Sequence, residues 1–208
     1  MVENKVGYDV LMKVPPRDLA RRLLDAGEEI LTGDPAPRLE DVAQMVGASR
    51  ASLYYYFAGR DDLLTFLLTA HAREGADLAR ERADDADPPP ARLRAMIEAM
   101  GEYLGTHPGV CAGLLAATGG GRRMAELLAV NDTLVAAPLR AVVGEGVASG
   151  LLAGDPADPT GVADAVNTVM GGLLFGVLGR ASSGGDPADA RFQRHLVDQI
   201  MRGLAPPP

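Results

Sequence analysis

Residues 50–55 place side chains that can make directional hydrogen bonds on the outer side of one short predicted helix. Leu53 is the apolar residue that this helix buries. The outward residues are Arg50, Ala51, Ser52, Tyr54 and Tyr55. So many exposed aromatic and hydroxyl groups are hard to explain as ordinary surface, and they suit contact with a DNA groove. A guanidinium can bond bidentately to guanine O6 and N7, so Arg50 is the best candidate for direct base readout.

The residues around this helix have the turn chemistry of a helix-turn-helix. Residues 39–46 have helical spacing, with Val42 and Val46 on one face. Gly47 can adopt the left-handed conformation that ends a helix. Ser49 can cap the next helix because its hydroxyl accepts a hydrogen bond from a backbone N–H. The sequence therefore predicts two short helices, over 39–46 and 50–57, joined by a tight turn.

The same window carries a family signature. Small and apolar residues stand where a helix-turn-helix needs them, at Val42, Ala43, Val46, Gly47, Ala48, Leu53 and Tyr56. The segment 47–64 resembles the TetR family of transcriptional regulators, whose recognition helix ends in Tyr-x-His-Phe, followed by Lys and an acidic, leucine-rich helix start. The matching residues here are Tyr54, Tyr55, Tyr56 and Phe57, then Arg60, Asp61, Asp62, Leu63 and Leu64. The remaining chain is similar to the family in length and layout, but not by any motif.

This resemblance implies a set of DNA contacts. They are Arg38, Ser49, Arg50, Ala51, Ser52, Tyr54, Tyr55, Tyr56 and Arg60. Ala51 is expected to pack on a thymine methyl, and Arg60 stands where a phosphate-binding Lys is usual. Tyr54 and Tyr55 would touch the sugar-phosphate backbone or thymine methyls, with two half-buried aromatics as the alternative. The Tyr56 ring could instead pack inward while its hydroxyl reaches a phosphate.

Three positions depart from the family pattern. Arg38 replaces the Thr that normally caps the second helix, which should cost about 1 kcal/mol of local stability. Glu40 stands where a basic or neutral residue is common, and Tyr56 replaces His. These departures affect which operator sequence is read, and not the mode of binding.

Composition limits the fold and the function classes. The 208 residues are 47% hydrophobic with four Phe, five Tyr and no Trp, and few stretches alternate with period two, so we expect an all-α protein with an aliphatic core. The single Cys111 excludes an intrachain disulfide and suggests a reducing compartment. The sequence shows neither an uninterrupted apolar span nor a signal-peptide pattern, so a soluble, cytoplasmic protein is expected.

The charge balance is unusual for a DNA-binding protein. The formal net charge is −8 and the pI is about 4.9. Residues 15–65 contain six Arg against nine Asp and Glu, a net charge of −3. The acids stand at predicted helix starts, where they complement the helix dipole, and residues 42–60 contain Arg50 and Arg60 but no acid. We therefore expect binding to a defined operator with weak affinity for random DNA.

Proline and glycine breaks divide the chain into three predicted regions. These are a flexible arm over 1–14, a helix-turn-helix domain over 15–60, and a helical ligand-binding and dimerisation domain over 61–208 that includes a connecting helix at 61–82. Outside the two reading helices, we predict helices over 16–31, 60–82, 91–105, 108–117, 123–149, 160–180 and 188–204. Pro138 should kink the helix 123–149, and residues 119–122 should form a turn.

The last two predicted helices are candidates for a homodimer interface. One head covers too little DNA for good specificity, so a two-fold dimer is expected. The candidate residues are Val166, Met170, Leu173, Val177, Phe192, Leu196 and Ile200. An internal core pair is the alternative; the resemblance, which implies dimerisation through these helices, favours the interface.

The middle helices are candidates for an effector cavity. The candidate lining residues are Met96, Met100, Tyr103, His107, Cys111, Leu115, Met124, Leu128, Asn131 and Phe175. Plain core is the alternative for each of them, because cavities and cores share this composition; His107 also fits a loop residue and Cys111 a small hydrophobe. No inward charge is expected, which favours a neutral, largely hydrophobic effector.

Together these observations predict a ligand-responsive regulator, most simply a repressor, that binds a pseudo-palindromic DNA operator as a dimer and is released by a small hydrophobic molecule. Two alternatives remain: an interaction module without specific DNA binding, and a small helical enzyme. The three scattered histidines, the single Cys and the missing metal and phosphate motifs offer no catalytic or cofactor site. We expect no enzyme activity, no cofactor and no metal.

Overall fold

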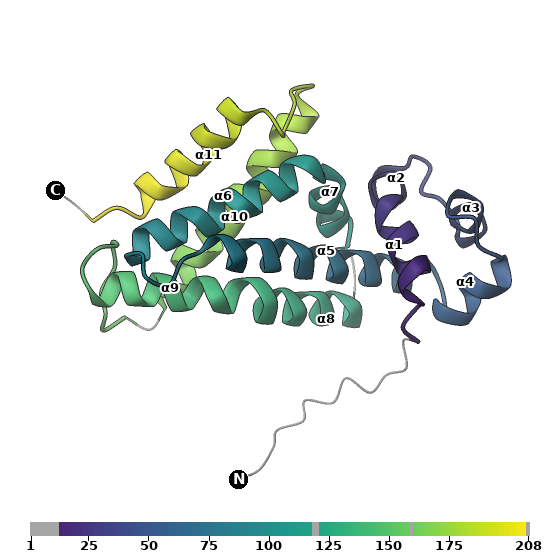
Figure 1. The fold of residues 1–208 in the computed structure, drawn as a ribbon, viewed down its shortest axis with the longest axis horizontal. Coiled ribbons are helices and arrows are strands. Elements are labelled where there is room, and N and C mark those ends of the chain that lie inside the picture. Colours follow the sequence, from purple (N-terminus) through teal and green to yellow (C-terminus); the bar gives the residue numbers. More distant parts are fainter. Residues whose placement is uncertain (1–12, 118–120, 159, 207–208) are drawn as a thin grey trace, which may run out of the picture.

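The computed structural model describes residues 13–117, 121–158 and 160–206, and every regular element in these ranges is helical. An N-terminal head contains α1 (Arg17–Asp25), α2 (Gly27–Thr32), α3 (Leu39–Met45) and α4 (Arg50–Tyr56). The long helix α5 (Arg60–Arg82) runs from the head into a larger helical body (Figure 1). The expected all-α fold is therefore confirmed. The predicted arm lies almost wholly outside the described residues.

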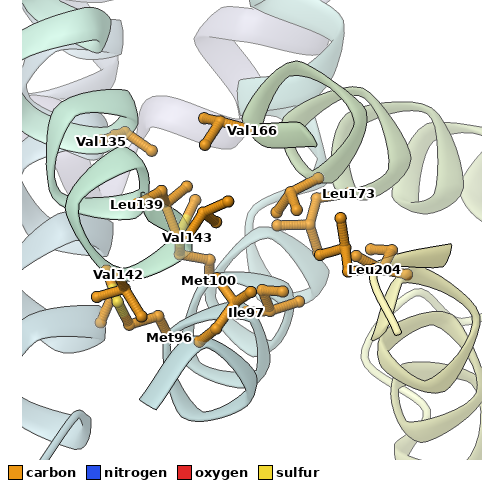
Figure 2. Packing of buried hydrophobic residues seen from close by; sticks show 14 of the residues in the cluster. Met96, Ile97, Met100, Val135, Leu139, Val142, Val143, Val166, Leu173 and Leu204 are labelled. Atoms are coloured by element: carbon orange, nitrogen blue, oxygen red, sulfur yellow. The ribbon is translucent and has the colours of Figure 1, made fainter. Parts of the chain in front are cut away.

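The body contains α6 (Pro89–Thr106), α7 (Pro108–Ala117), α8 (Gly121–Asn131), α9 (Ala137–Ala148), α10 (Gly161–Ser182) and α11 (Ala190–Gly203). Its core packs α6 against α9, α10 and the end of α11. Figure 2 shows Met96, Ile97 and Met100 of α6 among the apolar side chains of the neighbouring helices. An aliphatic core suits helices that contact each other through Leu, Val and Ile ridges.

Two predicted helices are interrupted in the structure. The predicted helix 16–31 is broken at Ala26, so that α1 and α2 are separate helices. The predicted helix 123–149 is divided by a π-helical turn, Asp132–Ala136, which separates α8 from α9. Pro138 has no N–H to donate to the carbonyl four residues earlier, and its ring crowds that carbonyl. The irregular turn therefore lies just before Pro138. The predicted turn at 119–122 falls mostly outside the described residues.

Helix α5 belongs to both cores. Near its start Leu63 and Leu67 are fully buried in the head core with Leu23, Leu53 and Phe57. Further along, Ala76 and Ala79 join the body core. One continuous helix therefore contributes buried residues to both cores.

Candidate functional site

The start of α4 is held by local hydrogen bonds and by α1. Gly47 adopts a φ of +60°, the left-handed conformation expected for the turn. Ser49 Oγ accepts the backbone N–H of Ser52 at 3.0 Å, which confirms the predicted cap. The guanidinium of Arg22 in α1 donates to the carbonyls of Val46 at 2.6 Å and Gly47 at 3.1 Å. Sequence reasoning missed Arg22, because its partners lie more than 20 residues away.

The outer face of α4 is as exposed as the sequence predicts. Leu53 and Phe57 are buried, whereas Tyr54 and Tyr55 are 51% and 58% exposed. Arg50 and Ala51 are exposed and Ser52 is half-buried. The alternative of two half-buried tyrosines is therefore wrong for Tyr54 and Tyr55.

Two further contacts extend this face. Tyr56 is half-buried against the head core and meets the Tyr55 ring edge-on, with centroids 5.0 Å apart. The ammonium of Lys13 lies 3.5 Å from the centroid of the Tyr55 ring, in cation–π contact. The last part of the predicted arm is thus in contact with the reading helix.

The departures from the family pattern have visible consequences at the start of α3. Arg38 is exposed, and its backbone N–H donates to Asp41 Oδ2 at 2.9 Å, which is one of the two hydrogen bonds of a capping box; Arg38 has no hydroxyl to make the other. The Tyr54 hydroxyl donates to Glu40 Oε1 at 2.7 Å. This bond lowers the pKa of Glu40, with smaller contributions from Arg50 and Arg38. It also raises the pKa of Tyr54. Glu40 is therefore ionised at neutral pH.

Arg60 stands at the first position of α5, beside the reading unit. It is half-buried, and among the described residues its buried Nε has no hydrogen-bond partner. A buried guanidinium N–H without an acceptor costs free energy unless something supplies one. An incoming phosphate oxygen is an acceptor of the required kind.

A cavity of about 270 Å³ lies inside the body. It is lined by apolar side chains of α5, α6, α7, α8 and α10, together with the polar residues Thr69, His71, Tyr103 and Asn131. Leu128 of α8 lines this cavity and is 59% exposed, so the cavity reaches the surface beside α8.

The polar end of the cavity is a chain of hydrogen bonds from α5 to α6. The Tyr103 hydroxyl donates to Glu74 Oε2 at 3.0 Å, so its oxygen accepts the proton of His71 Nδ1 at 2.7 Å. Burial lowers the pKa of His71 to about 4, with His107 adding to the effect and Glu74 opposing it. Burial also raises the pKa of Tyr103. Both rings are therefore neutral at neutral pH.

Comparisons with known proteins find transcriptional regulators that share this helical fold. No protein-family model matches the chain. The transcriptional repressor LfrR of Mycolicibacterium smegmatis is 35% identical over 79 residues, which span 38% of this chain and 41% of that protein. The chain thus matches less than half the length of this curated relative. The structure of the TetR-family regulator PfmR from Thermus thermophilus is 26% identical with a TM-score of 0.66, over 94% of this chain and 100% of that one.

The sequence match to LfrR and the structural match to PfmR both relate this chain to the TetR family of transcriptional regulators. Both of these proteins are transcriptional regulators. The fold is also shared with the regulator FadR from Bacillus subtilis, solved in complex with stearoyl-CoA. That structure is 16% identical with a TM-score of 0.68, over 88% of this chain and 98% of that one.

The structure separates the predicted cavity residues into two groups. Met100, Tyr103, Leu115, Leu128 and Asn131 line the cavity. Four others do not: Met96 and Cys111 are buried outside it, His107 stacks on the outer side of Tyr103 with centroids 4.4 Å apart, and Phe175 is 61% exposed on α10. The side chain of Met124 lies outside the described residues. The sequence missed His71 and Thr69 because the pattern of the connecting helix indicates only a link between the two regions.

Most of the predicted dimer residues are buried inside one chain. Val166, Leu173, Val177 and Ile200 are 1%, 1%, 0% and 8% exposed, so they cannot form the contact surface, and for them the internal-core alternative is correct. Figure 2 shows Val166 and Leu173 within the body core. Met170, Phe192 and Leu196 are half-buried, and their role in dimerisation stays a prediction.

The glycines of α10 serve packing within the chain. A Cβ added at Gly172 would lie 3.2 Å from the Ile200 side chain, and one at Gly176 would lie 2.7 Å from Leu196. These two glycines let α11 lie close against α10. The close helix approach at these two positions is therefore made inside one chain.

A second connection joins head and body besides α5. The Glu28 carboxylate of α2 accepts the backbone N–H of Gly109, at 2.8 and 2.9 Å from its two oxygens, at the start of α7. Beneath it, Leu31, Leu68, Val110 and Leu127 form a small apolar cluster. Val110 also lines the cavity, so α7 contacts both the cavity and the head.

Proposed function

We propose that the protein is a dimeric repressor that binds a pseudo-palindromic operator through α4 and releases it when a small, uncharged, largely apolar molecule occupies the body cavity. The observation that carries this proposal is the outer face of α4, where a capped helix exposes a guanidinium and two tyrosines. As a regulator of chromosomal genes, the protein would act in the cytoplasm.

Three groups of side chains would make three different kinds of DNA contact. Arg50, in the first turn of α4, would read a base edge. Tyr55, with Lys13 against its ring, would contact the sugar-phosphate backbone. Arg60, which is half-buried at the start of α5, would bring its guanidinium to a phosphate oxygen. Base contacts give sequence preference, whereas phosphate contacts give affinity and salt dependence.

The outer side of α10 would join the two subunits. Helices Ala125–Ala148 and Gly161–Ser182 are long and apolar enough to cross a membrane by length and composition alone, and only 22% of the most apolar window of the second is buried. Phe175 is exposed there, one helical turn before the half-buried Leu178. An exposed apolar face of this kind supports the proposal of an interaction site. To bind successive half-sites, a dimer joined through this face would have to hold its two heads about 34–36 Å apart.

The cavity would house the effector. Its walls are apolar, and its polar groups are neutral donors and acceptors, which favours an uncharged molecule with one polar end. An occupant that fits best when α5 or α7 has shifted would favour a different spacing of the heads. The occupant can shift the equilibrium between the DNA-binding and the shifted arrangement of the heads only by its difference in affinity for these two states.

The test begins with selection of bound fragments from genomic DNA, followed by fluorescence anisotropy with the recovered sequence and a random duplex. A preference for a two-fold symmetric sequence supports the proposal, and equal binding to both duplexes contradicts it. A thermal-shift screen of neutral apolar metabolites then identifies ligands. A ligand that binds the cavity tightly and leaves operator affinity unchanged would contradict the switch alone.

A further inference from the structure

The hydrogen bond between Glu40 and Tyr54 joins the two helices of the reading unit on their solvent side. Glu40 lies in the first turn of α3 and Tyr54 in α4, and the distance from the tyrosine oxygen to Glu40 Oε1 is 2.7 Å. Tyr54 is 51% exposed and Glu40 half-buried. In a helix-turn-helix the first helix crosses the phosphate backbone while the second enters the groove. A carboxylate at the start of α3 therefore lies where phosphates approach.

The direction of this hydrogen bond limits what Tyr54 can do. A phenol has one proton, and Tyr54 donates it to Glu40. Phosphate oxygens are acceptors and need a donor. While the bond is in place, the Tyr54 hydroxyl can accept a hydrogen bond but cannot donate one to a phosphate. Glu40 thus adds a negative charge to the reading face. It also takes up the Tyr54 proton that could otherwise be donated to a phosphate.

We propose that the Glu40–Tyr54 pair weakens sequence-independent DNA binding by this protein, so that stable binding requires base contacts from Arg50 and both heads of a dimer. The proposal rests on the DNA-binding function proposed above. Phosphate contacts supply essentially all of non-specific affinity, so a charge that opposes them acts on every sequence. The pair is therefore a specificity determinant located outside the base-reading residues.

The first experiment isolates the charge. Glu40→Gln keeps an oxygen that can accept from Tyr54 but removes the negative charge. Its affinity for a random duplex of about 30 base pairs should rise roughly threefold to tenfold per head at low salt. The slope of log K against log salt should steepen by up to about 0.9 per head. Glu29→Gln is the matched control, because it removes one exposed charge on α2, outside the helix-turn-helix.

The second experiment isolates the hydroxyl. Glu40→Ala frees Tyr54 to donate to a phosphate, so Tyr54→Phe should reduce DNA affinity in the Glu40→Ala background and leave it nearly unchanged in the parent. Thermal unfolding of each variant measures any structural effect, which would move the melting temperature without changing the salt slope.

The outcomes separate this proposal from the proposed function. If Glu40→Gln binds random DNA no better than the parent, the pair does not restrain binding. If Glu40→Gln instead loses affinity only for an operator with a particular cytosine, Glu40 is a base reader and the proposal is wrong. If neither parent nor variants bind any duplex at low salt, the DNA-binding function itself fails.

Discussion

At the scale of single residues, His71 and Tyr103 show how burial sets protonation. Two hydrogen bonds run in the same direction: His71 Nδ1 donates to the Tyr103 oxygen, and the Tyr103 hydroxyl donates to Glu74. His71 is 3% exposed, and its Nε2 is buried without a partner among the described residues. The neutral ring leaves that nitrogen as a bare acceptor, and adding a proton there would bury an uncompensated charge.

We predict that His71 makes the fold sensitive to acid. Its pKa is lowered to about 4 in the folded chain, from an ordinary value of 6.5. Between these values the unfolded chain binds the extra proton, so the free energy of unfolding should fall as the pH is lowered from 6.5 towards 4. Urea denaturation at pH 7 and pH 5 should show a smaller decrease for His71→Gln than for the parent. His195→Gln, at an exposed position of α11, is the control and should keep the parental decrease.

Arg50 and Arg60 should respond differently to truncation. Arg50→Ala removes a base contact. It should therefore reduce the discrimination between the correct and a wrong base pair by about 1–3 kcal/mol at one position of each half-site. Arg60→Ala should weaken binding to all duplexes and reduce the salt slope by about one per head, because it removes a phosphate contact. Anisotropy titrations on the operator, on singly substituted operators and on random DNA give all three quantities. Parental binding by both variants would contradict the assignment.

At the scale of elements, α7 is short but contacts both the head and the body cavity. A backbone N–H at its start donates to Glu28 of the head, and its apolar side lines the cavity. The Glu28 carboxylate stands at the N-terminus of α7, where negative charge is favourable to the helix dipole. The two connections, through α5 and through α7, fix the head at two points instead of one.

We predict that Glu28→Ala loosens the head. It leaves the partly buried N–H of Gly109 without an acceptor, which should lower the free energy of unfolding by about 1–3 kcal/mol. Hydrogen exchange should accelerate at the start of α7 and in α2. Glu29→Ala, the neighbouring exposed acid, serves as the comparison. Equal exchange in the two variants would show that the bond does not hold the head.

At the scale of the whole molecule, the notable feature is that the outer face of α10 exposes a large apolar side chain, Phe175, to solvent. Its inner residues, such as Leu173 and Val177, complete the core, while Phe175 remains in contact with solvent. One side of this apolar helix is therefore packed inside the body, while the other side leaves Phe175 exposed.

We predict that Phe175→Glu yields a folded monomer. The substituted residue is exposed in one chain, so folding should persist, but a buried charge in the subunit seam should cost several kcal/mol of association free energy. Sedimentation should show the monomer, and operator affinity should fall with it. Leu151→Glu, at another exposed apolar position, should remain a dimer. A dimeric Phe175→Glu protein would place the interface elsewhere.

The reading unit could be predicted from the sequence because its determinants are local. Gly47 at a left-handed turn, Ser49 as a cap and the apolar spacing of Val42, Val46 and Leu53 act within a few residues of one another. Such short-range chemistry specifies helix ends without the rest of the chain. The family signature lies in the same window.

Only the tertiary structure decided which face of α10 is internal and which residues reach the cavity. A helix that is apolar on nearly every side has no periodicity that selects a face, so Leu173 and Phe175 are equivalent in the sequence. The Tyr54–Glu40, His71–Tyr103 and Glu28–Gly109 contacts join residues 14, 32 and 81 positions apart. Their partners are set by how the helices pack, and no local pattern encodes that packing.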